Sequence, residues 1–193
     1  MKTRRQVDLG GMWGYQPIAW SVMTGPDRFD ESTEGLPPGG EMQIPCNWEL
    51  GGLSNFHGRV LFEREFEKPQ TGDGERVFLR FLGVDYFCKV SVNGHEVGRH
   101  EGYFQPFEFD VTEVLQEGKN TLSVEVHSPD EDINSLWPDR KRMIKGILNH
   151  WDCRPGAWDP ETGQERNSGG IWNRVYLEVR SRAYIRDVRV STF

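Results

Sequence analysis

Short runs in which apolar and polar residues alternate are the feature that most restricts how this chain can fold. Arg59 to Phe66 (RVLFEREF) places Val60, Phe62, Arg64 and Phe66 on one face. A repeat of two residues is the period of a β-strand, so this segment is predicted to be a strand with one buried face.

Other segments carry the same pattern. Their shared feature is a β-branched or aromatic face, and they are Val77–Phe81, Cys88–Val92, Thr121–His127 and Ile171–Val179. Asn93-Gly94 separates two alternating runs, which is a strong signal for a type I′ hairpin because both central residues need positive φ. Gly102-Tyr103 and Pro106-Phe107 are expected where the chain changes sheet.

Helical patterns are weak throughout. Asp110 to Leu115 favours one short turn with Asp110 as its cap, and no window longer than about ten residues has helical periodicity. Seven or eight short strands separated by Gly, Pro and Asn turns are typical of an all-β, antiparallel β-sandwich or jelly roll.

Two long stretches lack strand character, namely Ala19 to Met42 and His127 to Gly170. The second contains Trp137, Trp151 and Trp158. Structureless loops of this length are uncommon in compact domains, so two hypotheses arise. The loop is either pinned by its own aromatic cluster over one end of the sandwich, or it forms a wall of a binding site.

Charge and composition narrow the range of partners. The net charge of −7 argues against nucleic acid or an anionic membrane as a partner, and no apolar stretch reaches membrane-spanning length. Aromatic residues make up 12% of the chain, enough to fill a sandwich core and also a surface on which sugar rings stack. The basic start, Met1 to Arg5, is followed by polar residues where a signal peptide would be apolar, so no export signal is expected, and the compartment of a longer parent protein stays open.

Cysteines and motifs indicate little chemistry. Cys46, Cys88 and Cys153 are too few for a disulfide framework, and Cys88 is expected in the core. His150 and Cys153 have metal-like spacing but no second pair, so no metal and no cofactor are expected. No nucleophile elbow, phosphate loop or zinc-protease motif is present.

Four stretches together resemble the N-terminal sugar-binding domain of glycoside hydrolase family 2, the family of β-galactosidases, β-glucuronidases and β-mannosidases. They occur in the family's order and span nearly the whole chain. They are Leu9–Trp13 (LGGMW), Ile44–Trp48 with Phe56–Phe66, Leu82–Leu115 (including GVDYFCKVSVNGHEVGRHEGYFQPFEFDVTEVL) continued by Gly118–Leu122, and Asn167–Glu178 (NSGGIWNRVYLE). The resemblance implies a galactose-binding-domain-like jelly roll over residues 1–182.

The resemblance also implies where the chemistry lies. In the family the catalytic glutamates belong to a separate (β/α)8 barrel that follows an immunoglobulin-like domain. Residues 183–193, with the strand-like Tyr184 to Val190, resemble the entry to that second domain, although a strand that joins this sandwich is the other interpretation. The chain alone is therefore expected to be non-catalytic, with both later domains as partners, and oligomerisation through the parent protein stays open.

What this domain is expected to supply is one rim of the carbohydrate pocket. In galactosidase and glucuronidase members an aspartate lies seven residues before the isoleucine of the last motif, and this position is Gln164 here, with Glu165 beside it. A second rim position falls near Gly58, which has no side chain. Further candidates for sugar contact, which have suitable polar or ring chemistry, are Asn47, Trp151, Asp152, Arg154 and Trp158. A salt bridge and a packed indole within the loop are the alternative roles of Asp152, Arg154 and Trp158.

Three hypotheses for function follow. The first is an accessory domain that contributes the pocket rim to a retaining glycoside hydrolase. The second is an autonomous carbohydrate-binding module, which would bind a glycan through Trp151 or Trp158. The third is a structural domain that supports the barrel and an oligomer interface, which would leave an apolar patch exposed.

Overall fold

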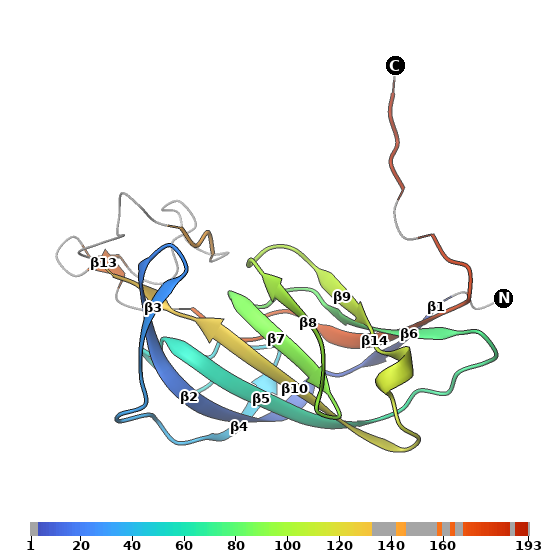
Figure 1. Ribbon diagram of the computed structural model, residues 1–193, viewed down its shortest axis with the longest axis horizontal. Coiled ribbons are helices and arrows are strands. Elements are labelled where there is room, and N and C mark those ends of the chain that lie inside the picture. The colour runs from blue at the N-terminus through green and yellow to red at the C-terminus, as the bar shows by residue number, and fades with distance from the viewer. Residues whose placement is uncertain are drawn as a thin grey trace.

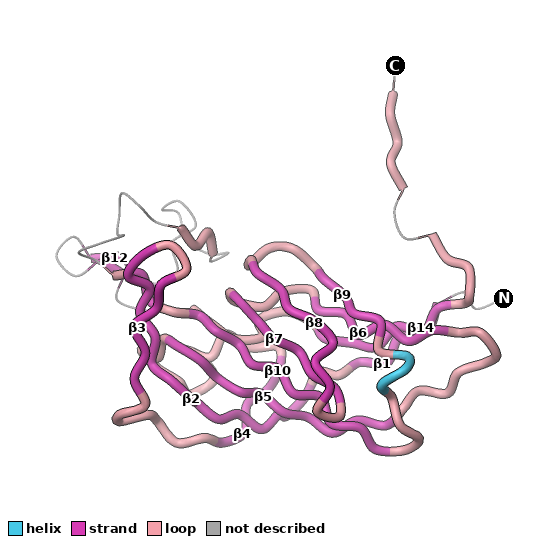
Figure 2. Tube along the Cα trace, viewed as in Figure 1, coloured by secondary structure: helices cyan, strands magenta, loops and turns pink. Residues whose placement is uncertain are grey.

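The computed structural model describes residues 4–132, 142–145, 158–159, 163–164, 168–185 and 188–192. Within these ranges the chain forms fourteen strands and one short 3₁₀ helix, η1 (Thr112–Val114). Figure 2 shows how completely strands dominate the tube. The prediction of an all-β fold is thus confirmed, and no helix in the described ranges is long and apolar enough to cross a membrane.

Two sheets pack face to face (Figure 1). The small sheet has the order β1 (Arg4–Asp8), β14 (Val175–Arg180), β6 (Arg76–Phe81) and β9 (Phe107–Asp110). The large sheet has the order β11 (Asp130–Glu131), β2 (Gly11–Gly25), β5 (Gly58–Glu67), β10 (Lys119–Ser128), β7 (Phe87–Val92) and β8 (His95–Glu101). Two further strands of the large sheet, β3 (Arg28–Ser32) and β4 (Gly40–Ile44), pair with β2.

The core lies between the sheets and follows the predicted alternation. Val60, Phe62 and Phe66 of β5 are buried, as are Leu79 of β6 and Val124 of β10. These side chains belong to one continuous apolar cluster contributed by both sheets. Burying their apolar surface is the main force that holds the two layers together.

Cys88 was predicted to be a small core residue, and it is buried on the inner face of β7. Burial raises the pKa of its thiol to about 12, so the group stays protonated and unreactive at neutral pH.

The local turns largely follow the sequence. Asn93 and Gly94 connect β7 to β8 with φ values of 52° and 79°, as a type I′ hairpin requires. The segment between β8 and β9 carries the chain from the large sheet to the small one, as predicted. The cap of η1 differs, because Val111 occupies the cap position. Asp110 instead accepts a hydrogen bond from the Thr112 backbone N–H at 3.1 Å, which forms a turn just before the helix.

The stretch from Ala19 to Met42 was expected to lack strands, and that expectation is wrong. β2 is fifteen residues long and continues to Gly25, and β3 pairs with its second half. The pattern misled because Ser21 is a polar residue on the buried face of β2, while four of the five residues of β3 are polar. The stretch from His127 to Gly170 likewise contains β11, β12 (Trp158–Asp159) and β13 (Gly163–Gln164), each of two residues.

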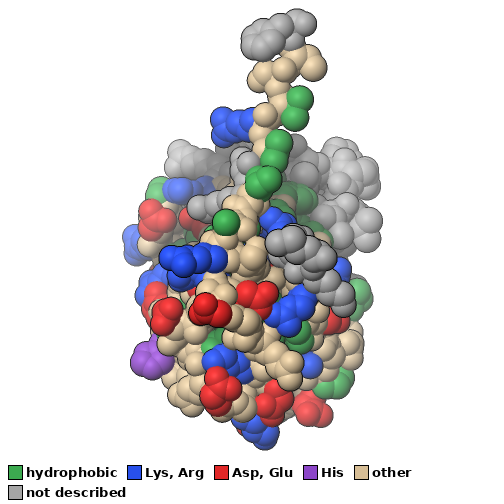
Figure 3. Space-filling model, turned by 90° about the vertical axis from the view of Figure 1, so that its right-hand side faces the viewer, with side chains coloured by type: hydrophobic (Ala, Val, Ile, Leu, Met, Phe, Trp, Pro, Cys, Tyr) green, Lys and Arg blue, Asp and Glu red, His purple; other side chains and the backbone are tan. Residues whose placement is uncertain are grey.

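The last segment of the chain stands apart from both sheets (Figures 1 and 3). Tyr184 to Val190 was predicted to be a strand, but its described residues, 184, 185 and 188–190, are not in strand conformation. A strand needs backbone hydrogen bonds from a neighbour. The segment continues past the end of β14, and the neighbours of β14, which are β1 and β6, begin at Arg4 and Arg76 opposite Arg180. Its beginning packs on the sandwich, where Tyr184 lies edge-on to Phe78 with ring centroids 5.3 Å apart.

Candidate functional site

One end of the sandwich, which we call the loop end, carries a buried polar cluster. The cluster consists of Asp85, Ser128, Lys145 and Ser168, each no more than 9% exposed. The Lys145 Nζ lies 3.2 Å from Asp85 Oδ1, 2.6 Å from Ser128 Oγ and 3.0 Å from the Ser168 carbonyl oxygen. The Ser168 hydroxyl donates to Asp85 Oδ2 at 2.7 Å. Segments distant in sequence are therefore joined by one ion pair and its hydrogen bonds.

The strands bring these groups together. Asp85 lies just before β7, and its backbone N–H donates to the Gly170 carbonyl at 3.0 Å. Ser128 is the last residue of β10, which is hydrogen-bonded to β7. Lys145, which belongs to a segment outside both sheets, is thus held against the ends of β7 and β10 by Asp85 and Ser128.

The electrostatics of the loop end favour a fixed arrangement. Complete burial raises the pKa of the Asp85 carboxyl, while the Lys145 ammonium and the two serine hydroxyls act in the opposite direction. Removing one partner of such a buried pair leaves an uncompensated charge and typically costs about 3–5 kcal/mol. The pair therefore restrains the position of residues 142–145 strongly.

A second contact holds the same segment. The buried Glu131 carboxylate accepts hydrogen bonds from the backbone N–H groups of Arg142 at 2.5 Å and of Met143 at 3.2 Å. Met143 packs against Met23 of β2 in a small apolar cluster. The segment 142–145 is therefore fixed by three contacts: its backbone N–H groups bind Glu131, the Met143 side chain packs on Met23, and the Lys145 ammonium pairs with Asp85.

The predicted rim residues fall into three groups. Trp158 and Gln164 are directly opposite each other in the β12–β13 ladder, so the structure brings these two positions together. Asn47 is described in full, and its Oδ1 accepts hydrogen bonds from the N–H groups of Glu49 at 3.1 Å and Gly169 at 3.4 Å. The remaining rim candidates lie outside the described residues, and they are Trp151, Asp152, Arg154 and Glu165. His150 and Cys153, which have the metal-like spacing, also lie outside them.

Close backbone packing explains two glycines of the motifs. A Cβ on Gly169 would lie 2.0 Å from Cζ2 of the buried Trp48, so the indole occupies the space of a side chain. The backbone at Gly169 and Gly170 thus runs close to Trp48. Gly58 opens β5 with φ of 144°, and a Cβ there would lie 2.0 Å from the Ala19 carbonyl oxygen.

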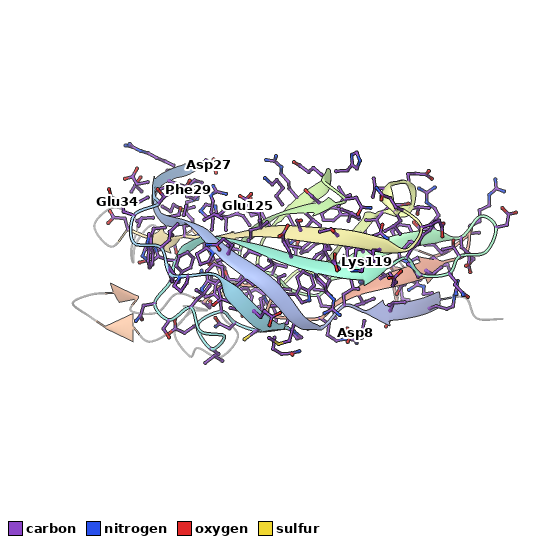
Figure 4. All side chains as sticks on the ribbon, turned by 90° about the horizontal axis from the view of Figure 1, so that it is seen from below. Asp8, Asp27, Phe29, Glu34, Lys119 and Glu125 are labelled. Carbon is purple, nitrogen blue, oxygen red and sulfur yellow. The ribbon has the colours of Figure 1, made fainter. Side chains whose placement is uncertain are left out.

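Sequence reasoning missed a groove of about 510 Å³ on the outer face of the large sheet. The β2–β3 hairpin supplies Asp27 and Phe29 to one side, and β8 supplies Arg99 and Glu101 to the other. Figure 4 shows Asp27, Phe29 and Glu125 on the same side of the molecule.

Strand register arranges the floor of this groove in two parallel rows. His127 of β10 faces both Arg59 of β5 and Phe87 of β7, and Phe87 faces Glu101 of β8. The next row contains Leu61, Glu125, Lys89 and Arg99 on the same four strands. The pattern of each strand predicts which residues point outward, but only the pairing of distant strands aligns them into rows.

An aromatic group closes one part of the groove. The ring of His127 lies between Phe29 and Phe87, with centroid distances of 4.7 Å and 5.6 Å. Its Nε2 is 2.8 Å from Ser21 Oγ. Burial, and then the positive charges of Arg59 and Lys145, lower the pKa of His127 to about 3. The imidazole is therefore neutral at physiological pH.

Charged side chains beside the rings are paired. The Glu125 carboxylate lies 3.0 Å from the Arg59 guanidinium and 2.9 Å from the Lys89 ammonium. Burial acts to raise the pKa of Glu125, but the two cations outweigh it and hold the pKa below its usual range. In the described ranges, no group of three His, Cys, Asp or Glu side chains is placed to hold a metal ion.

Known proteins share this architecture. A solved β-glucuronidase from an uncultured Clostridium sp. superposes with a TM-score of 0.60 and 25% identity, over 94% of this chain and 30% of that one. In sequence, the chain is 31% identical to the β-glucuronidase of Sus scrofa over 99% of its own length and 31% of the relative's. It is 30% identical to the β-galactosidase of Thermoanaerobacter pseudethanolicus over 66% of its length and 14% of the relative's.

These relatives are several times longer than the chain, which spans about a third of their length or less. The family model described as "Glycosyl hydrolase 2 galactose-binding domain-like" matches residues 56–172, which include β5 to β10 and all four residues of the buried polar cluster. With that match and the sandwich fold together, the chain belongs to the glycosyl hydrolase 2 galactose-binding domain-like family.

Proposed function

We propose that this chain is the non-catalytic N-terminal accessory domain of a family 2 glycoside hydrolase, and that its loop end contributes one rim of the carbohydrate pocket. The observation that supports this proposal is the fixed attachment at the loop end. Lys145 and Ser168, which flank the predicted rim positions in sequence, are both anchored to Asp85. A pocket wall must be held in place to orient a substrate, and a buried ion pair is suited to that task.

The chemistry of the rim follows from Gln164. A neutral amide donates and accepts hydrogen bonds with sugar hydroxyls but adds no charge. We therefore expect it to orient a neutral part of the substrate, while the acid, the base and the nucleophile come from a barrel domain of the parent protein.

The test uses both the 193-residue chain and the parent enzyme. The chain alone should release no p-nitrophenol from aryl β-glycosides. In the parent, Gln164→Ala should lower kcat/KM about tenfold, the usual effect of losing one hydrogen bond of about 1.4 kcal/mol in the transition state.

Glu117→Ala is the matched control. The Glu117 side chain is 89% exposed. Glu117 lies before the start of β10, whereas the loop end is at the far end of that strand. Activity of the isolated chain would contradict the accessory role, and unchanged kinetics of Gln164→Ala would contradict the rim.

A structural support role is the second candidate, and a specific observation favours it. Ile185, Val188 and Val190 are 69%, 69% and 84% exposed, and Figure 3 shows hydrophobic side chains along the projecting segment. Exposed apolar side chains in such a row indicate a surface that another domain would cover. This role would hold a following immunoglobulin-like domain and is compatible with the rim.

A further inference from the structure

We propose that the groove on the large sheet is a second carbohydrate site that binds a short neutral oligosaccharide, and its lining includes none of the predicted rim residues. The groove lies on the outer face of the sheet, between the β2–β3 hairpin and β8. Its volume of about 510 Å³ is within the range of roughly 300–1,000 Å³ that ligand sites have.

The balance of charge identifies the class of ligand. The groove is lined by three carboxylates and three cationic side chains, and they are Asp27, Glu101, Glu125, Arg59, Lys89 and Arg99. His127 adds no charge because its pKa is about 3. Without net charge, the groove does not attract a phosphate or an acidic peptide. Its donors and acceptors instead match hydroxyl groups, which do both.

The aromatic group supplies the apolar half of the recognition. Phe29 and Phe87 are half-buried, so part of each ring borders the groove. Their centroids are 6.0 Å apart and their planes nearly perpendicular, which fixes both rings. A pyranose has an apolar face of C–H groups that packs on such a ring, while its hydroxyls reach the neighbouring charges.

The length of the groove favours a chain over a single sugar. Its two rows cross β5, β10, β7 and β8. Three inter-strand spacings of about 4.8 Å give about 14 Å, so an extended oligosaccharide can run from Arg59 on β5, over the aromatic group on β10 and β7, to Arg99 or Glu101 on β8.

The wall is built into the sheet itself. β2 pairs with β5 up to Trp20 and then with β3 from Trp20 to Gly25, so the hairpin that carries Asp27 and Phe29 continues a strand of the sandwich. A site with rigid walls loses little entropy on binding, and this lets an uncharged ligand bind measurably.

Calorimetric titration of the 193-residue chain tests the proposal. The probes are cellotetraose, mannotetraose and β-1,4-galactotetraose as neutral chains, tetragalacturonate as an acidic chain, and glucose as a single sugar. At least one neutral tetrasaccharide should bind, more tightly than glucose and tetragalacturonate do. Phe29→Ala should weaken its binding about tenfold, as the loss of a stacked ring predicts.

The controls separate this site from the rim and from misfolding. Glu101→Gln keeps size and fold at an exposed position and should also weaken binding, whereas Phe104→Ala removes an exposed ring outside the groove and should not. The proposal is overturned if no neutral tetrasaccharide binds, if tetragalacturonate binds best, or if Gln164→Ala abolishes binding that Phe29→Ala and Glu101→Gln leave intact. Loss of binding in Gln164→Ala alone would support the rim, so the two proposals can fail independently.

Discussion

Single buried polar residues are the positions where sequence patterns fail in this domain. The side chains of Ser21 and His127 are buried, and Ser21 Oγ and His127 Nε2 form a hydrogen bond of 2.8 Å. A polar residue on an apolar face is usual only when it has such a partner, because an unpaired buried group costs about 1–3 kcal/mol. The partner is more than a hundred residues away in sequence, so nothing near Ser21 revealed it.

His127 gives the domain a defined response to acid. In the unfolded chain a histidine takes up a proton near pH 6.5, whereas in the folded domain the pKa of His127 is about 3. Between these values the unfolded state binds more protons, so the free energy of unfolding falls as pH falls, by up to about 1.4 kcal/mol per pH unit from this group.

His127→Gln, which retains a hydrogen-bonding side chain, removes this contribution. Urea denaturation measures the free energy of unfolding at pH 7 and at pH 5. On going from pH 7 to pH 5, the unchanged protein should lose about 2 kcal/mol more of this free energy than the variant does. The comparison between the two proteins cancels other titrating groups, including His100, whose pKa is also lowered by burial. Equal losses in both proteins would show that His127 is protonated in the folded domain.

At the scale of elements, the strands with clean alternation were predictable and the others were not. β5, β6, β7 and β10 were found from their own patterns, because each has one apolar face against the core. β3 was missed because its polar residues pack over the outside of the sheet, where the Arg59 guanidinium meets Glu31 at 2.7 Å. The groove was missed for the related reason that strand register, which sequence does not reveal, aligns its rows.

The connection before β14 shows how a motif of small residues serves packing. Gly169→Ala should lower the free energy of unfolding by about 1–3 kcal/mol or more, because the new methyl group would overlap Trp48. Gly14→Ala is the matched control, since a Cβ there would meet nothing closer than the Glu63 carbonyl at 3.8 Å. Thermal unfolding of both variants measures the difference, and equal midpoints would mean that Trp48 can move aside without cost.

At the scale of the whole molecule, the fold class and the family were recognisable from sequence because the hairpin, the turns and the glycines at close contacts are architectural. The sugar contacts of all the rim candidates stay predictions, including those of Asn47, Trp158 and Gln164. The segment that carries most of the candidates is mostly outside the described residues. The projecting segment was read as a strand from its alternation alone, although alternation cannot supply a neighbouring strand.

The projecting segment should affect association more than stability. Replacing both Val188 and Val190 by Ser should leave the free energy of unfolding within about 0.5 kcal/mol, because both side chains are exposed. Light scattering at high protein concentration should show less self-association. Tyr184→Ala provides the contrast, since its ring packs on Phe78 and lies 5.1 Å from the Arg180 guanidinium, and it should lower the unfolding midpoint. Unchanged scattering in the double variant would mean that these valines do not contribute to self-association.

The continuity of β2 has a kinetic consequence. One strand of fifteen residues belongs to the sandwich at its start and to the wall of the groove at its end. Beyond Trp20 the wall is tied to the rest of the large sheet by the pairing of Val22 and Met23 with β11, so it cannot swing away without breaking these hydrogen bonds. Amide exchange at Val22 and Met23 should therefore be slower than at the tip of the β2–β3 hairpin. A ligand would meet an entrance of constant width, and its rate of capture would rise linearly with its concentration, without the plateau that a gating step imposes.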